Sequence, residues 1–170
     1  MSEVDLSPDE GWEPLIRSDL PKTHSFVAGD VDPDRLQIVY YACKKDGQRR
    51  AKVWFGPHAE GPPGCAHGGS VAAVLDEAMG GNCWGSGHAV VAGTLTVRYR
   101  ELVPLCAVHT VATRIERIEG RKVFASSTLS TRDGKLLAEG EGVFIQVRPE
   151  ALARFQQAYE SGTYRLPSDF

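Results

Sequence analysis

The residues of this chain that are best placed to do chemistry lie within residues 60–76, which read EGPPGCAHGGSVAAVLD. His67, Gly68 and Gly69 stand where a helix is predicted to begin, and the first backbone N–H groups of a helix have no acceptor within it. These groups lie at the positive end of the helix dipole, and glycine leaves them open, so a carbonyl or an oxyanion can dock there. Asp76 follows two to three turns later and is a candidate base or nucleophile.

The same residues also have ordinary structural interpretations. Asp76 could be an exposed helix carboxylate, and His67 could simply bond backbone groups of its own loop. The two glycines could serve close packing at the start of the helix. Glu77 is the second choice for the base, although neighbouring residues of a helix usually face different directions.

Three other kinds of site fit the sequence less well. An HGG triplet also occurs in the oxyanion loop of lipases, but those enzymes need a GxSxG element, which this chain lacks. Cys65 and Cys83 are candidate thiol nucleophiles, and only Cys65 has a histidine nearby in sequence. Cys65 and His67 could begin a metal site, but no second close pair of ligands accompanies them, so we predict no metal.

The predicted helix carries its apolar residues on one side, at the spacing typical of a helix packed against a sheet. These residues are Val71, Val74, Leu75, Ala78 and Met79. Asp76 lies off this apolar stripe, beside Ala72, Ala73 and Gly80, so a ligand or a second subunit can approach it closely. Gly80-Gly81 is predicted to end the helix.

Strand-like runs lie on both sides of this helix. Two precede it, 37–42 and 50–55, and four follow it, 90–101, 107–118, 122–131 and 136–147. Short turns join several of these runs, which favours antiparallel pairing. In the run after the helix, the alternation predicts Val91, Leu95, Val97 and Tyr99 on one face, and Thr94, Thr96, Arg98 and Arg100 on the other. The order of elements predicts an α+β domain in which the helix buries its stripe against the sheet.

The stretch HGGSVAAVLDEAMG resembles the HGG-type acyl-CoA thioesterases, which have the hotdog fold and include phenylacetyl-CoA-type enzymes. With GPPG before HGG, and RYRELVPLC and EGRKVF after the helix, the chain looks like the branch that contains the mammalian mitochondrial long-chain acyl-CoA thioesterases. The resemblance covers roughly Val53–Val147 and is far more specific than HGG alone. It implies a hotdog fold, one long central helix wrapped by a five- to six-stranded antiparallel sheet. It also implies dimers with active sites between subunits.

The resemblance assigns roles to individual residues. It implies that Asp76 is the catalytic acid and that the N–H of Gly68, with Gly69 as a candidate second donor, polarises the thioester. It gives His67 a role in shaping the loop and in binding near the substrate carbonyl. Members of the family commonly carry Ser or Thr seven residues before the tyrosine that is Tyr99 here, a position that Ala92 occupies. Thr94 lies two residues further on, and we expect it on the same strand face as a substitute hydroxyl.

The phosphates of CoA need cations, and the chain has no phosphate-binding loop of the GxxxxGK[ST] type. By the resemblance, Arg121 and Lys122 are the candidates, with Arg98 or Arg100 as helpers. Gly69 and Glu77 complete the candidate substrate-binding residues.

The bulk composition limits the partners. The chain has 170 residues and a net charge of −3, so no basic field indicates a nucleic acid. No apolar run is long enough for a membrane helix, and the N-terminus lacks a signal-peptide pattern. None of the four cysteines forms a CxxC pair, which favours a reduced, cytoplasmic setting. We expect an arm over 1–35 with a helical turn near Trp12–Arg17, a hotdog domain over 36–148 and an extension over 149–170 that starts with a short helix, Glu150–Tyr159.

The sequence therefore predicts hydrolysis of an acyl-CoA thioester to a free acid and CoA by a homodimer or dimer of dimers, with no cofactor. Two alternatives remain open: a non-catalytic protein that binds acyl-CoA or acyl-carrier protein, and a thioesterase that acts on an acyl-carrier protein.

Overall fold

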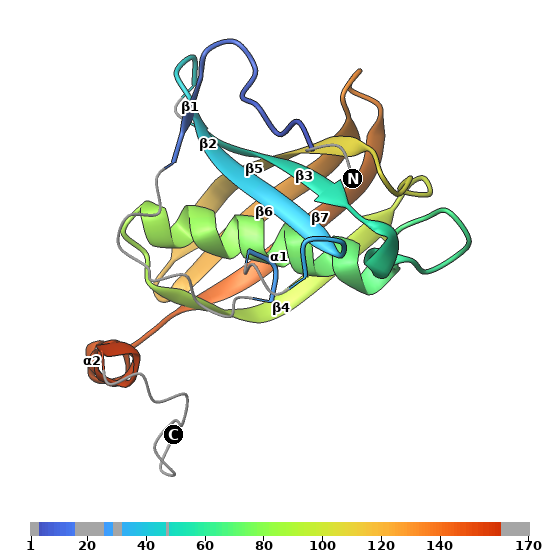
Figure 1. Cartoon of the computed structure of the whole chain (residues 1–170). Helices are drawn as coiled ribbons and strands as arrows, with labels where there is room; N and C mark the ends of the chain where they lie inside the picture. Colours follow the sequence, from blue (N-terminus) through green and yellow to red (C-terminus); the bar gives the residue numbers. More distant parts are fainter. Residues whose placement is uncertain (1–3, 16–25, 29–31, 47, 161–170) are drawn as a thin grey trace.

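The strands of the chain form one antiparallel sheet that curves around a long helix, α1 (Figure 1). The computed structural model describes residues 4–15, 26–28, 32–46 and 48–160. The sheet has seven strands in the order β1-β2-β3-β5-β6-β7-β4. The elements are β1 Trp12–Pro14, β2 Leu36–Cys43, β3 Arg49–Phe55, a short 3-10 helix Pro57–Ala59, α1 Gly68–Gly85, β4 Val90–Tyr99, β5 Val108–Glu119, β6 Lys122–Thr131, β7 Leu136–Gln146 and α2 Pro149–Glu160.

The predicted α+β arrangement is confirmed, because each of the six expected strands is present and the helix packs on the sheet. The seventh strand, β1, lies where we expected a helical turn near Trp12–Arg17. That prediction is wrong for Trp12–Pro14, which pairs with β2; Arg17 lies outside the described residues. Side-chain packing explains the difference, since the Trp12 ring lies 5.7 Å from the ring of Tyr41 and 4.9 Å from the buried Lys52 ammonium.

Helix α1 runs through the predicted stop at Gly80-Gly81 and ends at Gly85, with Ser86 as its C-cap. The helix continues because Asn82 and Cys83 extend the buried stripe by another turn. The Arg49 guanidinium packs against Gly85, since a Cβ atom there would lie 1.7 Å from it and would require the arginine side chain to move. The predicted stripe is confirmed, with Val71, Val74, Leu75, Ala78 and Met79 each at most 2% exposed.

A bulge in β4 changes which side chains face the helix. Ala92 pairs with Phe144, but Thr94 pairs with Val143, so Gly93 is an extra residue in the ladder. Paired residues share a face, and Phe144 packs with Met79 of α1. Ala92 therefore faces α1 and Thr94 faces away, so the prediction that they share a face is wrong. Val91, expected on the face of Leu95, Val97 and Tyr99, pairs with Ile145 on the outer face and is 48% exposed.

Helix α1 and the sheet lie close together at Gly140 of β7. A Cβ atom there would lie 2.7 Å from Ser127 Oγ and 3.3 Å from both Leu75 and Met79. This contact holds α1 at a fixed depth against the sheet, with its solvent-facing side left open. The predicted helix in the C-terminal extension is confirmed as α2, which lies apart from the sheet in Figure 1.

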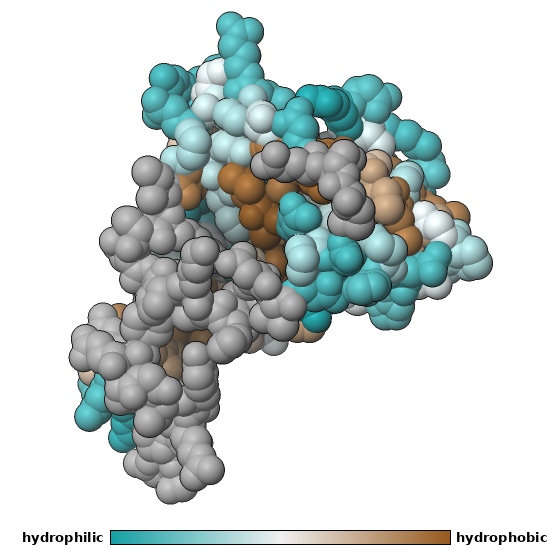
Figure 2. All heavy atoms as spheres, viewed as in Figure 1, coloured by the Kyte–Doolittle hydropathy of each residue, from teal (hydrophilic) through white to brown (hydrophobic). Residues whose placement is uncertain are grey.

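Within the described residues, no helix combines the length and the apolar character that crossing a membrane requires. In the space-filling view, hydrophobic residues reach the surface near the middle of the face shown in Figure 1, and hydrophilic residues surround them (Figure 2).

Candidate active site

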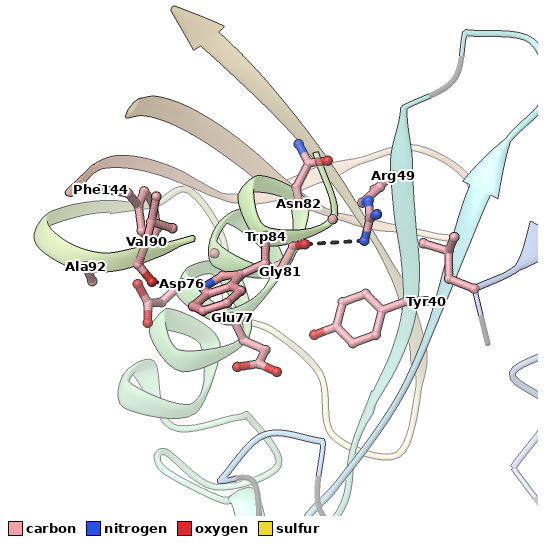
Figure 3. Close-up of a pocket in the computed structure, with 14 residues that line it drawn as sticks. Tyr40, Arg49, Asp76, Glu77, Gly81, Asn82, Trp84, Val90, Ala92 and Phe144 are labelled. Carbon is pink, nitrogen blue, oxygen red and sulfur yellow. Dashed lines mark hydrogen bonds between the residues drawn. The ribbon is translucent and has the colours of Figure 1, made fainter. Parts of the chain in front are cut away.

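A cavity of about 640 Å³ opens along the second half of α1. Its wall combines the open side of the helix with the beginning of β4 on one side and with β2 and β3 on the other (Figure 3). The described lining residues are Leu15, Tyr40, Arg49, Asp76, Glu77, Ala78, Gly80, Gly81, Asn82, Trp84, Gly85, Val90, Ala92 and Phe144. The structure therefore brings both predicted carboxylates, Asp76 and Glu77, to one cavity.

Asp76 points its carboxylate into the part of the cavity next to Val90 and Ala92 (Figure 3). Its Oδ1 is buried and has no hydrogen-bond partner within the described part of the chain. Burial, and next the charge of Glu77, raise the pKa of the Asp76 carboxyl above its usual 3.8. A half-buried carboxylate with a free oxygen in a cavity can take a proton from water or attack a bound carbonyl.

Glu77 points to the other side of the helix, toward the cavity wall that carries Tyr40 (Figure 3). The two acids thus lie in one cavity but face different parts of it. The side of Asp76 is lined by apolar groups, including Phe144 and Val90, and the side of Glu77 also contains Arg49, whose guanidinium donates to the carbonyl of Gly81.

His67 is the N-cap of α1 and determines which backbone N–H groups stay open. Its Nδ1 accepts a hydrogen bond from the N–H of Gly69 at 3.0 Å. Gly69 is therefore not the free second donor that we had expected. The N–H of Gly68 has no acceptor in the described part of the chain. The carbonyl of Gly68 accepts from the hydroxyl of Tyr99 at 2.8 Å. Gly68 is therefore the open donor, and Tyr99 holds its peptide in place.

Backbone bonds from the segment after β4 fix the loop that carries this donor. Ala66 N–H donates to the Val103 carbonyl at 2.8 Å, and Leu105 N–H donates to the Gly64 carbonyl at 3.0 Å. His109, 1% exposed, lies 3.0 Å through Nε2 from the Pro104 carbonyl, and burial lowers the pKa of this imidazole. A neutral His109 is thus a positioning group beneath the loop.

Gly68 and Asp76 are eight residues apart on one straight helix, which separates them by about 12 Å at the usual rise per residue. Gly68 is also absent from the described lining of the cavity. One protomer therefore cannot present both groups to the same carbonyl.

Comparison with known proteins indicates the family of the chain. A family model described as "Thioesterase superfamily" matches residues 63–138, which include both the HGG loop and Asp76. A Bos taurus protein named "Acyl-coenzyme A thioesterase THEM4" is 36% identical over 120 residues, 69% of this chain and 49% of that protein. Residues 63–138 of the chain belong to the thioesterase superfamily. The chain spans about half the length of the curated relatives it matches.

Solved structures of the superfamily have the same hotdog fold. A thioesterase superfamily protein of known crystal structure is 31% identical, with a TM-score of 0.60, over 65% of this chain and 54% of that chain. A Bacillus halodurans protein crystallised with CoA is 24% identical, with a TM-score of 0.55, over 61% of this chain and 70% of that chain, a likeness that concerns the fold alone.

The remaining predicted residues of this superfamily member lie outside the cavity. Thr94 is exposed on the outer face of the sheet. Arg98 lies on that face too, in a salt bridge of 2.8 Å to Glu141, whose hydrogen bond raises the pKa of the guanidinium. Arg121 donates to the carbonyl of Gln146, and Lys122 begins β6 with its side chain exposed. Since Gln146 pairs with Val90, these two cations lie at the end of the sheet where the cavity begins.

Sequence reasoning missed several lining residues. Tyr40 and Phe144 lie in predicted strands, where nothing in the sequence marks them as cavity residues, and Asn82 and Trp84 fell beyond the predicted end of the helix. Trp84 donates from Nε1 to the carbonyl of Val90 at 2.8 Å, which fixes the ring at the edge of the cavity. Only a continuation of the apolar spacing to Cys83 could have indicated the extra turn. Among the described residues, no group of three or more potential ligands could hold a metal ion.

The raised pKa of Asp76 predicts a gain of stability when its charge is removed. Below the unfolded-state pKa the carboxyl is protonated and its burial is not penalised, and this stability is lost as pH rises through the higher folded-state pKa. Asp76→Asn should therefore melt at a higher temperature than wild type at pH 7, and the difference should vanish near pH 3.

Asp46→Asn is a control of opposite sign, because the Gln48 N–H and Arg50 lower the pKa of that carboxyl. This variant should melt below wild type at pH 7. Thermal unfolding followed by circular dichroism across this pH range measures both, and an Asp76→Asn variant that melts below wild type at pH 7 contradicts the account.

Proposed function

We propose that this chain hydrolyses acyl-CoA thioesters to a free acid and CoA. The observation that supports it most is the Asp76 carboxylate, which holds an unpartnered oxygen inside a cavity of a thioesterase-superfamily fold. The curated relatives are named as acyl-CoA thioesterases, and one structural neighbour was crystallised with CoA. A cytoplasmic setting is part of the proposal, and the free cysteines are in keeping with it.

In the proposed reaction, Asp76 acts on the carbonyl carbon of the thioester. As a base it takes a proton from water, whose oxygen bonds to that carbon; as a nucleophile it bonds to the carbon itself, and water hydrolyses the resulting anhydride. In both routes the C–S bond breaks, and the departing thiolate of CoA gains a proton. No cofactor enters either route.

The N–H of Gly68 is the proposed donor to the oxyanion. Its peptide partner, the carbonyl of His67, accepts bonds from the N–H of Ser70 at 2.9 Å and from the Ser70 hydroxyl at 2.7 Å. Bonds to that carbonyl polarise the peptide and strengthen its N–H as a donor. His67 acts by capping Gly69, which leaves Gly68 as the one open N–H in this pair of glycines.

The distance from Gly68 to Asp76 requires a second protomer, so we propose a homodimer or a dimer of dimers. Each cavity would then combine Asp76 of one protomer with Gly68 N–H of its partner. Strand β4 pairs only with β7 within the described residues, so its other edge is available for pairing between copies. We propose Arg121 and Lys122 as cations for the CoA phosphates. Arg98, on the outer face with Glu141, would serve only across such an interface.

One observation favours the second candidate, a non-catalytic protein that binds acyl-CoA or acyl-carrier protein. Ala92 faces the cavity where the family commonly has a hydroxyl, and Thr94 faces away from it. Water would then lack one of its positioning groups. The free Asp76 oxygen supports catalysis over binding, since a pure binder gains nothing from a buried carboxylate without a partner.

The first test removes the Asp76 charge. Asp76→Asn keeps size and hydrogen bonding, so turnover of the best acyl-CoA substrate should fall by roughly 10²–10⁴-fold while KM changes much less. Glu77→Gln should keep turnover near neutral pH and move the acid limb of the pH profile to lower pH, because the Glu77 charge helps raise the pKa of Asp76. Thiol release across CoA and carrier-protein thioesters measures both variants. Full turnover by Asp76→Asn excludes the proposed role.

The second test deletes the proposed oxyanion donor. Gly68 is the first residue of α1, where proline is well tolerated, and His67, at φ −62° and ψ 135°, already has the extended backbone required before proline. Gly68→Pro replaces the N–H with a ring carbon, so turnover should fall by about 10²–10³-fold in a protein that still folds. Gly68→Ala is the matched control that keeps the N–H, with its Cβ 3.4 Å from Tyr99. Equal turnover of the two variants means that this N–H is not the donor.

A further inference from the structure

Two buried polar side chains near the C-terminal end of α1 have no hydrogen bond. Asn82 is 8% exposed and lines the cavity, and its carboxamide makes no bond within the described residues. Thr113 of β5 is 5% exposed, and its buried Oγ1 likewise has no hydrogen-bond partner among the described residues. Neither residue takes part in the hydrolysis proposed for Asp76.

Of the two residues, Asn82 is among the described residues that line the cavity and Thr113 is not. Thr113 pairs with Arg49 in the β3–β5 ladder, so both side chains lie on the face of the sheet toward α1. The Arg49 guanidinium reaches the carbonyl of Gly81, the residue before Asn82, and lines the cavity with it (Figure 3). We call Asn82 and Arg49 the polar end of the cavity, and Thr113 lies beside Arg49 in the sheet.

An apolar pair would suit folding better at these positions. Position 82 continues the stripe of Val71, Val74, Leu75 and Ala78 that packs on the sheet. A buried amide or hydroxyl without a partner destabilises the folded state, whereas leucine or valine of similar shape does not. Unsatisfied polar groups that face a cavity indicate a bound ligand or ordered water that completes their bonds.

We propose that the polar end binds a neutral oxygen, a hydroxyl or keto group, carried by the acyl part of the substrate. The inference rests on the proposed function and specifies its substrate class as oxygenated acyl-CoA. Asn82 lies six residues after Asp76, which places the polar end about 9 Å along the helix from the reacting carbonyl. The oxygen is therefore far along the acyl chain rather than next to the thioester.

The charges favour a neutral group over a carboxylate. The described lining residues include one cation, Arg49, and two acids, Asp76 and Glu77. A second carboxylate on the ligand would add to this negative charge in a partly desolvated space. A hydroxyl can accept from the Asn82 amide and donate to the Asn82 side-chain carbonyl, and a keto oxygen can accept from the same amide.

The first experiment measures stability without ligand. Asn82→Leu with Thr113→Val removes two unsatisfied polar groups, so the double variant should melt about 2–4 °C above wild type. Ser127→Ala is the matched control, since Ser127 is equally buried on the same face but already donates to the Leu75 carbonyl. It should not melt above wild type. A double variant that melts below wild type overturns the inference, because the polar groups would then be bonded for folding.

The second experiment measures selectivity. Wild type should hydrolyse the CoA thioester of an ω-hydroxy octanoic or decanoic acid with kcat/KM about 10-fold above the plain thioester of equal length. The double variant should lose that preference and keep its activity on the plain thioester, and Ser127→Ala should retain the preference. Equal preference in wild type and double variant for both lengths overturns the inference while the proposed function stands.

If the proposed function is wrong, the wild type will show no thioester hydrolysis at all, which differs from a mere loss of selectivity. If wild type hydrolyses neither kind of thioester, calorimetry with the free ω-hydroxy and plain acids still tests the polar end. Tighter binding of the hydroxy acid by wild type alone supports the inference, and equal binding by wild type and double variant overturns it.

Discussion

The packing of α1 against the concave side of the sheet determines where every other functional group lies. Val71, Val74 and Leu75 are fully buried there, and Gly140 lets the helix approach the sheet closely. Once this stripe is fixed, the helix has no rotational freedom left. Asp76 must then point sideways into the cavity, the open N–H of Gly68 must lie at the far N-terminal end, and Asn82 must face the sheet near the other end. The functional groups therefore lie at fixed positions along one helix.

The fixed position of this helix affects both the assembly of the protein and its stability. Because the helix is straight, Gly68 and Asp76 stay about 12 Å apart in any one protomer, so a shared carbonyl needs two copies of the chain. Two of the buried polar atoms that have no partner among the described residues, the Asp76 Oδ1 and the Thr113 hydroxyl, lie on or near this helix. Both are expected to reduce the stability of the unliganded protein, which is the usual compromise at a binding site.

The sequence was sufficient where side-chain periodicity and steric rules act locally. The stripe on α1, the hairpins from β2 to β3 and from β5 to β7, and the open start of the helix follow from spacing and turn residues alone. Prediction failed where a single residue, or a contact between residues distant in sequence, determines the local structure. Gly93 inserts a bulge that turns Thr94 away from Ala92, Arg49 and the buried Asn82 let α1 continue past Gly81, and the Trp12–Tyr41 contact makes a strand of an expected turn. None of these has a local signal.

A mixing experiment tests the central claim, that an Asp76 carboxylate acts on a carbonyl held by another protomer's Gly68. Asp76→Asn and Gly68→Pro proteins are each purified, unfolded together in equal amounts and refolded, and thiol release is measured. If dimers form at random, half are mixed, and one of the two sites in each mixed dimer has both intact groups, so activity should recover to about a quarter of wild type. Activity that stays at the level of the separate variants would contradict the account, because both groups would then act within one protomer.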